Sequence, residues 1–209
     1  MDDLKPSFMI VAGPNGSGKT TLTRMVLQHD WAFGHHYINA DDIAQQELGD
    51  WNSPEAVLKA AQIADRRRED YLANRQDFVS ETVFSTSARV AFVERALAAG
   101  YFVRMYFVGT SDPAINVERI RKRVTEGGHD VPTDKIVARY HRSIANLQGV
   151  LPVVDRAYVF DNSIDRMPAV RWARTRNGII ARVADGEMPR WIEEALTSPA
   201  PKPAPGSER

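Results

Sequence analysis

The residues most suited to chemistry lie in a glycine-rich segment near the start of the chain. It reads Gly13, Pro14, Asn15, Gly16, Ser17, Gly18, Lys19 and Thr20, which fits the phosphate-binding pattern G-x-x-x-x-G-K-[ST] without a mismatch. Its glycines allow backbone N–H groups to turn inward on an anion, and a following helix adds partial positive charge. We expect Lys19 to reach the β- and γ-phosphates and Thr20 to hold Mg²⁺, with Thr21 completing the nucleotide-binding segment. The motif predicts a nucleoside triphosphate site.

A second candidate is the pair of acids Asp41 and Asp42, which follows a short predicted strand at residues 35–39. A carboxylate at this place can accept the proton of a hydroxyl that attacks the γ-phosphate. We assign that catalytic role to Asp41. The alternative is that one of the two acids caps a helix beginning at Ile43.

Glu81 and Thr82 end another apolar segment at residues 78–81. A glutamate at a strand end must meet water, a metal shell or a ligand, because burying it unpaired is costly. We therefore predict that Glu81 and Thr82 contact a substrate. An outer-shell contact to Mg²⁺ and a structural ion pair are the alternatives for Glu81.

Four arginines form a third cluster on two consecutive helical segments. Their spacings of four and three residues place each pair on one helix face, and a glycine-containing loop at 127–132 separates the pairs. Such a lid could neutralise a transferring phosphoryl group and exclude water. The first pair is Arg119 and Arg123, and the second is Arg139 and Arg142. We assign catalytic roles to Arg123 and Arg139, and ATP binding to Arg119 and Arg142. A solvated charged face is the alternative, and it is also our interpretation of the separate triplet Arg66–Arg68.

Strand and helix patterns alternate along the chain. Strands are expected near 8–12, 35–39, 78–81, 101–108 and 157–161, and helices at 20–27, 54–74, 85–99, 113–125 and 133–148. This order predicts an α/β fold with a mostly parallel five-stranded sheet and helices on both faces. Asn177-Gly178 predicts a C-terminal β-hairpin over 170–184. Ligands of such sheets bind at the carboxyl ends of the strands, where the candidate residues lie.

Composition limits the remaining possibilities. The 209 residues predict one domain, 1–197, with a lid at about 119–142 and a disordered, proline-rich tail at 198–209. The 27 basic and 27 acidic residues cancel, so neither a polyanion binder nor an acidic substrate mimic is expected. No nucleic acid is expected as a partner, and no membrane either, since no apolar run approaches the length needed to span one. With no cysteines, disulfides and thiolate chemistry are excluded. ATP use and the lack of a signal-like apolar segment favour a cytoplasmic location.

Missing motifs narrow the class of phosphate-loop protein. A GTPase would need an Asp-x-x-Gly and an Asn-Lys-x-Asp string, and an ABC-type ATPase a Leu-Ser-Gly-Gly-Gln-like signature; none occurs. A small kinase remains.

The order of motifs resembles the zeta toxin family. The resemblance rests on the segment from Val11 to Thr21, on Ile38–Asp41, Ser80–Thr82, Gly127–Pro132 with Arg139-Tyr140, and Phe160–Ser163. It implies a kinase-type fold and an ATP- and Mg²⁺-dependent phosphotransferase with Asp41 as the base. In zeta toxins proper the acceptor is a UDP-N-acetyl sugar, and an antitoxin protein is the partner. The lid sequence Gly-Gly-His-Asp-Val-Pro departs from the founding members.

Two other functions remain open at this point. A polynucleotide or nucleotide kinase would share the fold and the position of the base, although no basic stretch interleaved with aromatic residues is evident along the chain. A non-enzymatic module gated by ATP is the third reading, and the presence of Asp41 beside a complete phosphate loop disfavours it.

Overall fold

The computed structural model describes residues 5–50 and 52–197, which build one seven-stranded sheet in the order β2-β3-β1-β4-β5-β6-β7. The strands are β1 (Ser7–Ala12), β2 (His36–Ile38), β3 (Phe78–Thr82), β4 (Phe102–Gly109), β5 (Arg156–Asp161), β6 (Val170–Arg176) and β7 (Ile179–Val183). The first five strands pair in parallel, as predicted. β6 and β7 pair antiparallel and extend the same sheet beyond the five strands expected.

The hairpin forms where the sequence predicts it. Asn177 and Gly178 both have positive φ, 48° and 75°, which is the backbone of the two-residue turn that matches strand twist. A side chain at Gly178 would also collide with the Pro152 carbonyl, since an added Cβ would lie 2.5 Å from that oxygen.

The helices are α1 (Lys19–Leu27), α2 (Ala40–Asp42), α3 (Pro54–Ala73), α4 (Ser87–Ala98), α5 (Pro113–Thr125), α6 (Thr133–Val150) and α7 (Arg190–Thr197). Ser53 and Asp112 cap α3 and α5 by accepting from the Ala56 and Ala114 N–H groups. α6 begins at Thr133 and has no side-chain cap. The helix α7 has no counterpart in the sequence-based prediction, although Trp191, Ile192 and Ala195 are spaced as one buried helical face.

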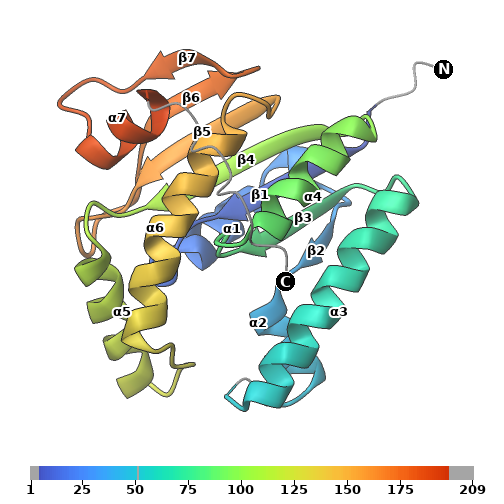
Figure 1. Cartoon of the computed structure of the whole chain (residues 1–209), viewed down its shortest axis with the longest axis vertical. Coiled ribbons are helices and arrows are strands. Elements are labelled where there is room, and N and C mark those ends of the chain that lie inside the picture. The colour runs from blue at the N-terminus through green and yellow to red at the C-terminus, as the bar shows by residue number, and fades with distance from the viewer. Residues whose placement is uncertain (1–4, 51, 198–209) are drawn as a thin grey trace, which may run out of the picture.

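Helices cover both faces of the sheet, as expected. In Figure 1, α4, α6 and α7 lie in front of the sheet, and α1 lies behind it. The front layer buries the larger apolar core, which joins Phe78 and Phe107 of the strands to residues of α3, α4, α6 and α7. The layer behind is smaller and joins Leu22 and Val26 of α1 to β1, β3 and β4. A third cluster, with Ile120 and Ile136, packs α5 against α6.

Two expectations concern the ends and the surroundings of the chain. The predicted tail at 198–209 lies outside the described residues. Over the part of the chain that the structure describes, no helix combines the length and apolarity needed to cross a membrane.

Candidate active site

A cavity of about 600 Å³ opens at the carboxyl ends of the parallel strands, between α5 and α6 on one side and α2 and α3 on the other (Figure 1). The sequence-predicted residues that line it are Asn15, Gly16, Gly18, Lys19, Thr20, Thr21, Asp41, Glu81, Thr82, Arg119, Arg123, Arg139 and Arg142. Gly13, Pro14 and Ser17 do not line it, because they form the packed side of the same loop. The fold therefore gathers four separate stretches of sequence around one space.

The loop from Gly13 to Thr20 has the backbone of an anion cradle. Gly16 and Gly18 take φ values of 75° and 97°, which favour glycine. An added Cβ at Gly13 would lie 2.0 Å from the Val108 carbonyl oxygen, so the loop also packs closely on β4. The Ser17 hydroxyl is buried and has no hydrogen-bond partner among the described residues. The N-terminus of α1 points its free N–H groups into this loop, so the residues present fit a polyphosphate.

Two asparagines that the sequence analysis missed hold the loop in place. Asn116 Nδ2 of α5 donates to the Asn15 carbonyl at 2.5 Å, and Asn162 Nδ2 donates to the Ser17 carbonyl at 2.9 Å. The loop glycines leave room for them, since a Cβ on Gly18 would lie 2.4 Å from Asn162 Nδ2. Asn162 follows β5 directly, so its place at a strand end is the signal that could have identified it. The Asn116 side chain carries no comparable signal.

Lys19 is partly buried under the loop at the edge of the cavity, where its Nζ donates to the Pro14 carbonyl at 2.9 Å. Burial lowers the pKa of the ammonium group, and the nearby carboxylates of Glu81 and Asp41 oppose this shift. Arg123 and Arg139 lower it further. The ammonium group thus lies among two acids and two guanidinium groups, and a bound phosphate would balance the positive charge of the lysine and the two arginines.

Glu81 accepts three hydrogen bonds on the α1 side of the sheet. Thr23 Oγ1 donates to it at 2.6 Å, the Tyr37 hydroxyl at 3.3 Å and Thr20 Oγ1 at 3.4 Å. Burial and the Glu81 charge raise the pKa of the Tyr37 phenol. Glu81 thus contacts the residue expected to hold Mg²⁺, an arrangement that fits the outer-shell alternative better than direct substrate contact.

The two adjacent acids point into different surroundings. Asp41 lines the cavity, and its charge partly opposes the lowering of the Lys19 and Arg123 pKa values by burial. Asp42 does not line it; burial and the charges of Glu81 and Asp41 raise the pKa of its carboxyl group. Neither acid caps a helix starting at Ile43. That alternative is wrong, because the helix begins at Ala40 and continues into a π-helical turn at Ile43–Glu47, where the Asp42 side chain makes no cap bond. The cap is Asn39, whose Oδ1 accepts from the Asp41 N–H at 2.9 Å.

The four lid arginines all reach the cavity, but each has a different partner. Arg119 Nη1 donates to the Asn162 carbonyl at 2.8 Å, and Arg139 Nη1 donates to Asn15 Oδ1 at 3.4 Å. Arg123 donates to the His129 carbonyl of the lid loop, and burial lowers its pKa. These three stand at the nucleotide side.

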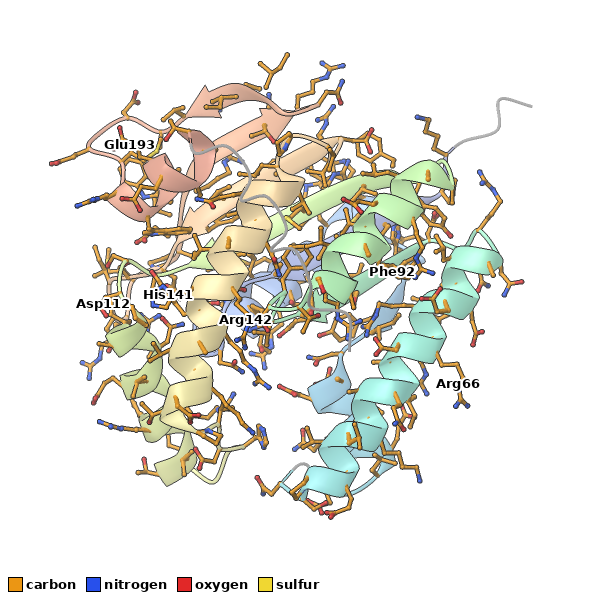
Figure 2. The ribbon with its side chains drawn as sticks, in the orientation of Figure 1. Arg66, Phe92, Asp112, His141, Arg142 and Glu193 are labelled. Atoms are coloured by element: carbon orange, nitrogen blue, oxygen red, sulfur yellow. The ribbon has the colours of Figure 1, made fainter. Side chains whose placement is uncertain are left out.

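The fourth arginine, Arg142, lies on the side of α6 that faces α4 (Figure 2) and donates through Nε to the Ser85 carbonyl at 3.2 Å. It thereby fastens the turn after β3. Asn146 Nδ2 donates to the Phe84 carbonyl at 2.9 Å, and Ser143 donates to the Val83 carbonyl. Phe84 has φ of 59°, a left-handed backbone that a bulky residue rarely adopts, so these bonds hold a strained turn. Arg142 therefore contacts the turn after β3 and not the phosphate loop, where the sequence had predicted it.

The turn also fixes Thr82, whose Oγ1 accepts from the Phe84 N–H at 3.2 Å. The Thr82 hydroxyl keeps its own proton for donation, and Thr82 lines the cavity.

The interpretation of Arg66–Arg68 as a solvated face is wrong for its last member. Arg68 is 4% exposed, lines the cavity, and donates through Nη1 to Ser80 Oγ at 3.2 Å. Arg68 and Arg89 both pair with Asp65, which joins α3 to α4. Ala60 and Ala64 lie eight and four residues before Arg68 on the same helix face, and both are buried. This spacing was the signal that Arg68 faces inward.

Mg²⁺ prefers few protein ligands together with waters and substrate phosphates. In the described residues no group of three or more His, Asp or Glu side chains could form an all-protein metal site. The Thr20 hydroxyl beside Glu81, with Asp41 across the cavity, fits an ion that a nucleotide brings with it.

Comparisons with known proteins agree with this architecture. Residues 1–166 match the family described as Zeta toxin. A Haemophilus influenzae protein described as uncharacterized is 30% identical over 128 residues, which cover 61% of this chain and 88% of that protein.

Two solved structures show the same fold. A chain of the AvrRxo1-ORF1:-ORF2 crystal structure with ATP superposes with a TM-score of 0.66 at 16% identity, covering 96% of this chain and 66% of that one. This chain therefore spans just under two thirds of that relative. A chain from the PezAT toxin-antitoxin system of Streptococcus pneumoniae superposes with a TM-score of 0.60 at 17% identity, covering 81% of this chain and 72% of that one.

Proposed function

Because the chain belongs to the zeta toxin family, we propose that it is a phosphotransferase that moves the γ-phosphate of ATP to a hydroxyl group of a small metabolite. The observation that carries the proposal is the position of Asp41. This acid lines the cavity close to Lys19 and Arg123, so a base and two phosphate-binding cations surround the same space. Residues 1–197 act as one catalytic domain in this proposal, with 119–142 as its lid.

The nucleotide side would bind and orient the triphosphate. Backbone N–H groups of the cavity-lining loop residues Gly16, Gly18, Lys19 and Thr20 would hold the phosphate oxygens, and Lys19 would supply a charge. The Thr20 hydroxyl, which donates to Glu81, would hold Mg²⁺, with the Glu81 carboxylate behind it in the outer shell. When bound, the ion neutralises charge on the phosphates.

The acceptor side would present the hydroxyl group. Asp41 accepts its proton, the oxygen attacks the γ-phosphorus, and the bond from that phosphorus to the bridging oxygen breaks to leave ADP. Arg123 and Arg139 stabilise the charge on the group in transfer, while Arg119 holds the loop after β5. Thr82 and Arg142, on and against the turn after β3, contact the acceptor.

The family relationship suggests a UDP-N-acetyl sugar as the acceptor and a growth-arresting role countered by an antitoxin protein. Support for the partner comes from neighbours that are themselves a two-component complex and a toxin-antitoxin system. A polynucleotide kinase is the second candidate, since a chain of an RNA repair complex containing Pnkp1 has a similar fold, with a TM-score of 0.51.

The decisive experiment uses the protein with γ-labelled ATP, Mg²⁺ and three acceptor pools: UDP-N-acetyl sugars, a fractionated small-molecule extract, and 5′-hydroxyl oligonucleotides. We expect label in a small molecule, identified by mass spectrometry. A folded Lys19→Ala variant must lose the transfer. Label only in oligonucleotides would favour the second candidate, and no label in any pool would favour the module gated by ATP.

The lid assignment has a separate test. Arg123→Ala and Arg139→Ala should lower kcat more than they raise the Kd for ATP, because the charge that they stabilise grows during transfer. Equal changes in both quantities would make these arginines ordinary nucleotide contacts.

A further inference from the structure

One face of the sheet is left largely uncovered at its C-terminal side. On the side of the sheet opposite α6 and α7, helix α1 packs against β1 and β3. In Figure 1, α6 and α7 lie in front of β5 and β6, so the uncovered face is the one turned away from the viewer. It lies outside the cavity and is open at β6 and β7, where Arg171, Arg176 and Arg182 are exposed. Toward β4 and β5 the smaller core closes it, and Tyr106, Val108 and Tyr158 are buried there.

This uncovered face is rich in arginine. Directly paired residues of neighbouring strands point to the same side of a sheet. Arg104 pairs with Arg156, and Arg156 pairs with Arg176, which makes one row across three strands. Arg174 pairs with Arg182 in the next row. Arg171 of β6 pairs with Phe160 of β5 and points to the same side. We call this set the arginine face: Arg104, Arg156, Arg171, Arg174, Arg176 and Arg182.

No acid balances these charges. The other residues that β4 to β7 present on this side are apolar or aromatic: Phe102, Tyr106, Val108, Tyr158, Phe160 and Ile179. None of the six arginines forms an ion pair with any residue that the structure describes. Neighbouring positions lie about 5 Å apart across strands and about 7 Å apart along them. Six like charges at this spacing repel one another, and a bound polyanion would remove that repulsion.

Aromatic rings accompany the arginines. The Arg104 guanidinium lies 4.3 Å from the centre of the Trp31 ring and 5.3 Å from that of Phe102. Tyr106 and Tyr158 stack with their centres 5.0 Å apart beneath the same rows. At the border, Trp31 is 46% exposed, and Phe33, two residues further on, is 91% exposed.

We propose that the arginine face binds single-stranded nucleic acid, with its guanidinium groups on phosphates and the border aromatics available to bases. Arginine matches phosphate with paired N–H donors, and exposed aromatic rings beside basic groups, as Trp31 and Phe33 are, suit unpaired bases. An acidic protein fits less well, because the centre of a protein interface is usually poor in charged residues. A nucleic-acid partner is not expected from the sequence, since these arginines are spread over 79 residues and only strand pairing brings them together.

The test is fluorescence anisotropy of a labelled 20-nucleotide oligouridylate with the full chain at several salt concentrations. Binding should weaken linearly on a log–log plot, with a slope of about −0.7 for each phosphate contacted. The variant Arg174→Gln/Arg176→Gln should bind about tenfold more weakly, with a shallower slope. Its matched control is Lys59→Gln/Arg66→Gln, which removes two charges from α3; Figure 2 shows Arg66 on the outer side of that helix. Both variants should keep the thermal shift induced by ATP, which shows that they fold.

Selective loss in the first variant supports the proposal. Absence of oligouridylate binding at 50 mM salt, or equal loss in the two variants, overturns it. Polyglutamate and vesicles with about 30% phosphatidylserine serve as competing anions. Tighter binding of either one than of oligouridylate, with the same dependence on Arg174 and Arg176, would assign the face to an acidic protein or a membrane and would also overturn the proposal.

Discussion

The nucleotide side and the acceptor side of the cavity are built in different ways. The nucleotide side is one contiguous loop whose carbonyls are held by two asparagine amides, Asn116 and Asn162. The acceptor side is assembled from α2, α3, the turn after β3 and α6, and its charged groups pair with one another, as Arg68 and Arg89 do with Asp65. The first design fixes one ligand through backbone geometry. The second leaves recognition to side chains, which can change without disturbing the fold.

The largest effect should come from Lys19→Met on the nucleotide side. Transfer should fall by at least about 10²–10³-fold, because a charge aimed at the phosphates is lost in a water-poor site. The ligand-free variant should nevertheless melt at a higher temperature than the wild type, since it removes a desolvated ammonium. Calorimetry with and without ATP measures both effects, and a lower melting temperature without ligand would show that Lys19 stabilises the empty loop.

The pH dependence of the same residue checks its cause. The folded-state pKa of Lys19 lies below 10.5, so the unfolded chain binds more protons between those two values. Wild-type stability should therefore gain a contribution as pH rises through the folded pKa, and Lys19→Met should lack it. Identical pH profiles for the two proteins would contradict the buried-charge argument.

The second effect separates the adjacent acids at the boundary of the two sides. Asp41→Asn should lower single-turnover transfer by about 10²–10⁴-fold and leave ATP affinity nearly unchanged, because it removes the base and keeps the shape. Asp42→Asn should transfer at nearly the wild-type rate. The Asp42 pKa is raised in the fold, so its charge is unfavourable at pH 7 and the variant should be at least as stable as the wild type. The reverse pattern would make Asp42 the base.

The sequence predicted the nucleotide side of the cavity better than the acceptor side. The phosphate loop, the five parallel strands and the hairpin at Asn177-Gly178 depend on local patterns, and the structure has them all. Arg68 was misread because the run of three arginines outweighed a weaker signal, the helical spacing of Arg68 from Ala60 and Ala64. The alternative that an acid of the pair Asp41-Asp42 caps a helix was wrong, because Asn39 is the cap. Asparagine and aspartate are equally good caps, so residue type could not distinguish them. The supports Asn116 and Asn146 act across long sequence separations, where a single sequence carries no signal.

The third prediction tests the support of the nucleotide side. Asn162→Ala removes the bond from Nδ2 to the Ser17 carbonyl, a loss that should raise the Kd for ATP about 2–10-fold. The matched control is Asn74→Ala, which removes a similar amide bond, to the Asp70 carbonyl, on the surface. Isothermal titration with ATP measures both. An unchanged Kd for Asn162→Ala would mean that the loop keeps its shape without this amide.

The smallest effect should come from Asn146→Ala on the acceptor side. Its amide donates to the Phe84 and Thr86 carbonyls at 2.9 and 3.3 Å, and so holds a turn in which Phe84 has a left-handed backbone. Without these bonds the strained turn should open more often, because the remaining bonds from Ser143 and Arg142 must hold it alone. Hydrogen exchange of residues 82–86 should become about 2–10-fold faster, while residues 13–20 exchange at the wild-type rate. This readout needs no knowledge of the acceptor. Faster exchange in both segments would mean that the two sides of the cavity open together, and the separation between them drawn above would be wrong.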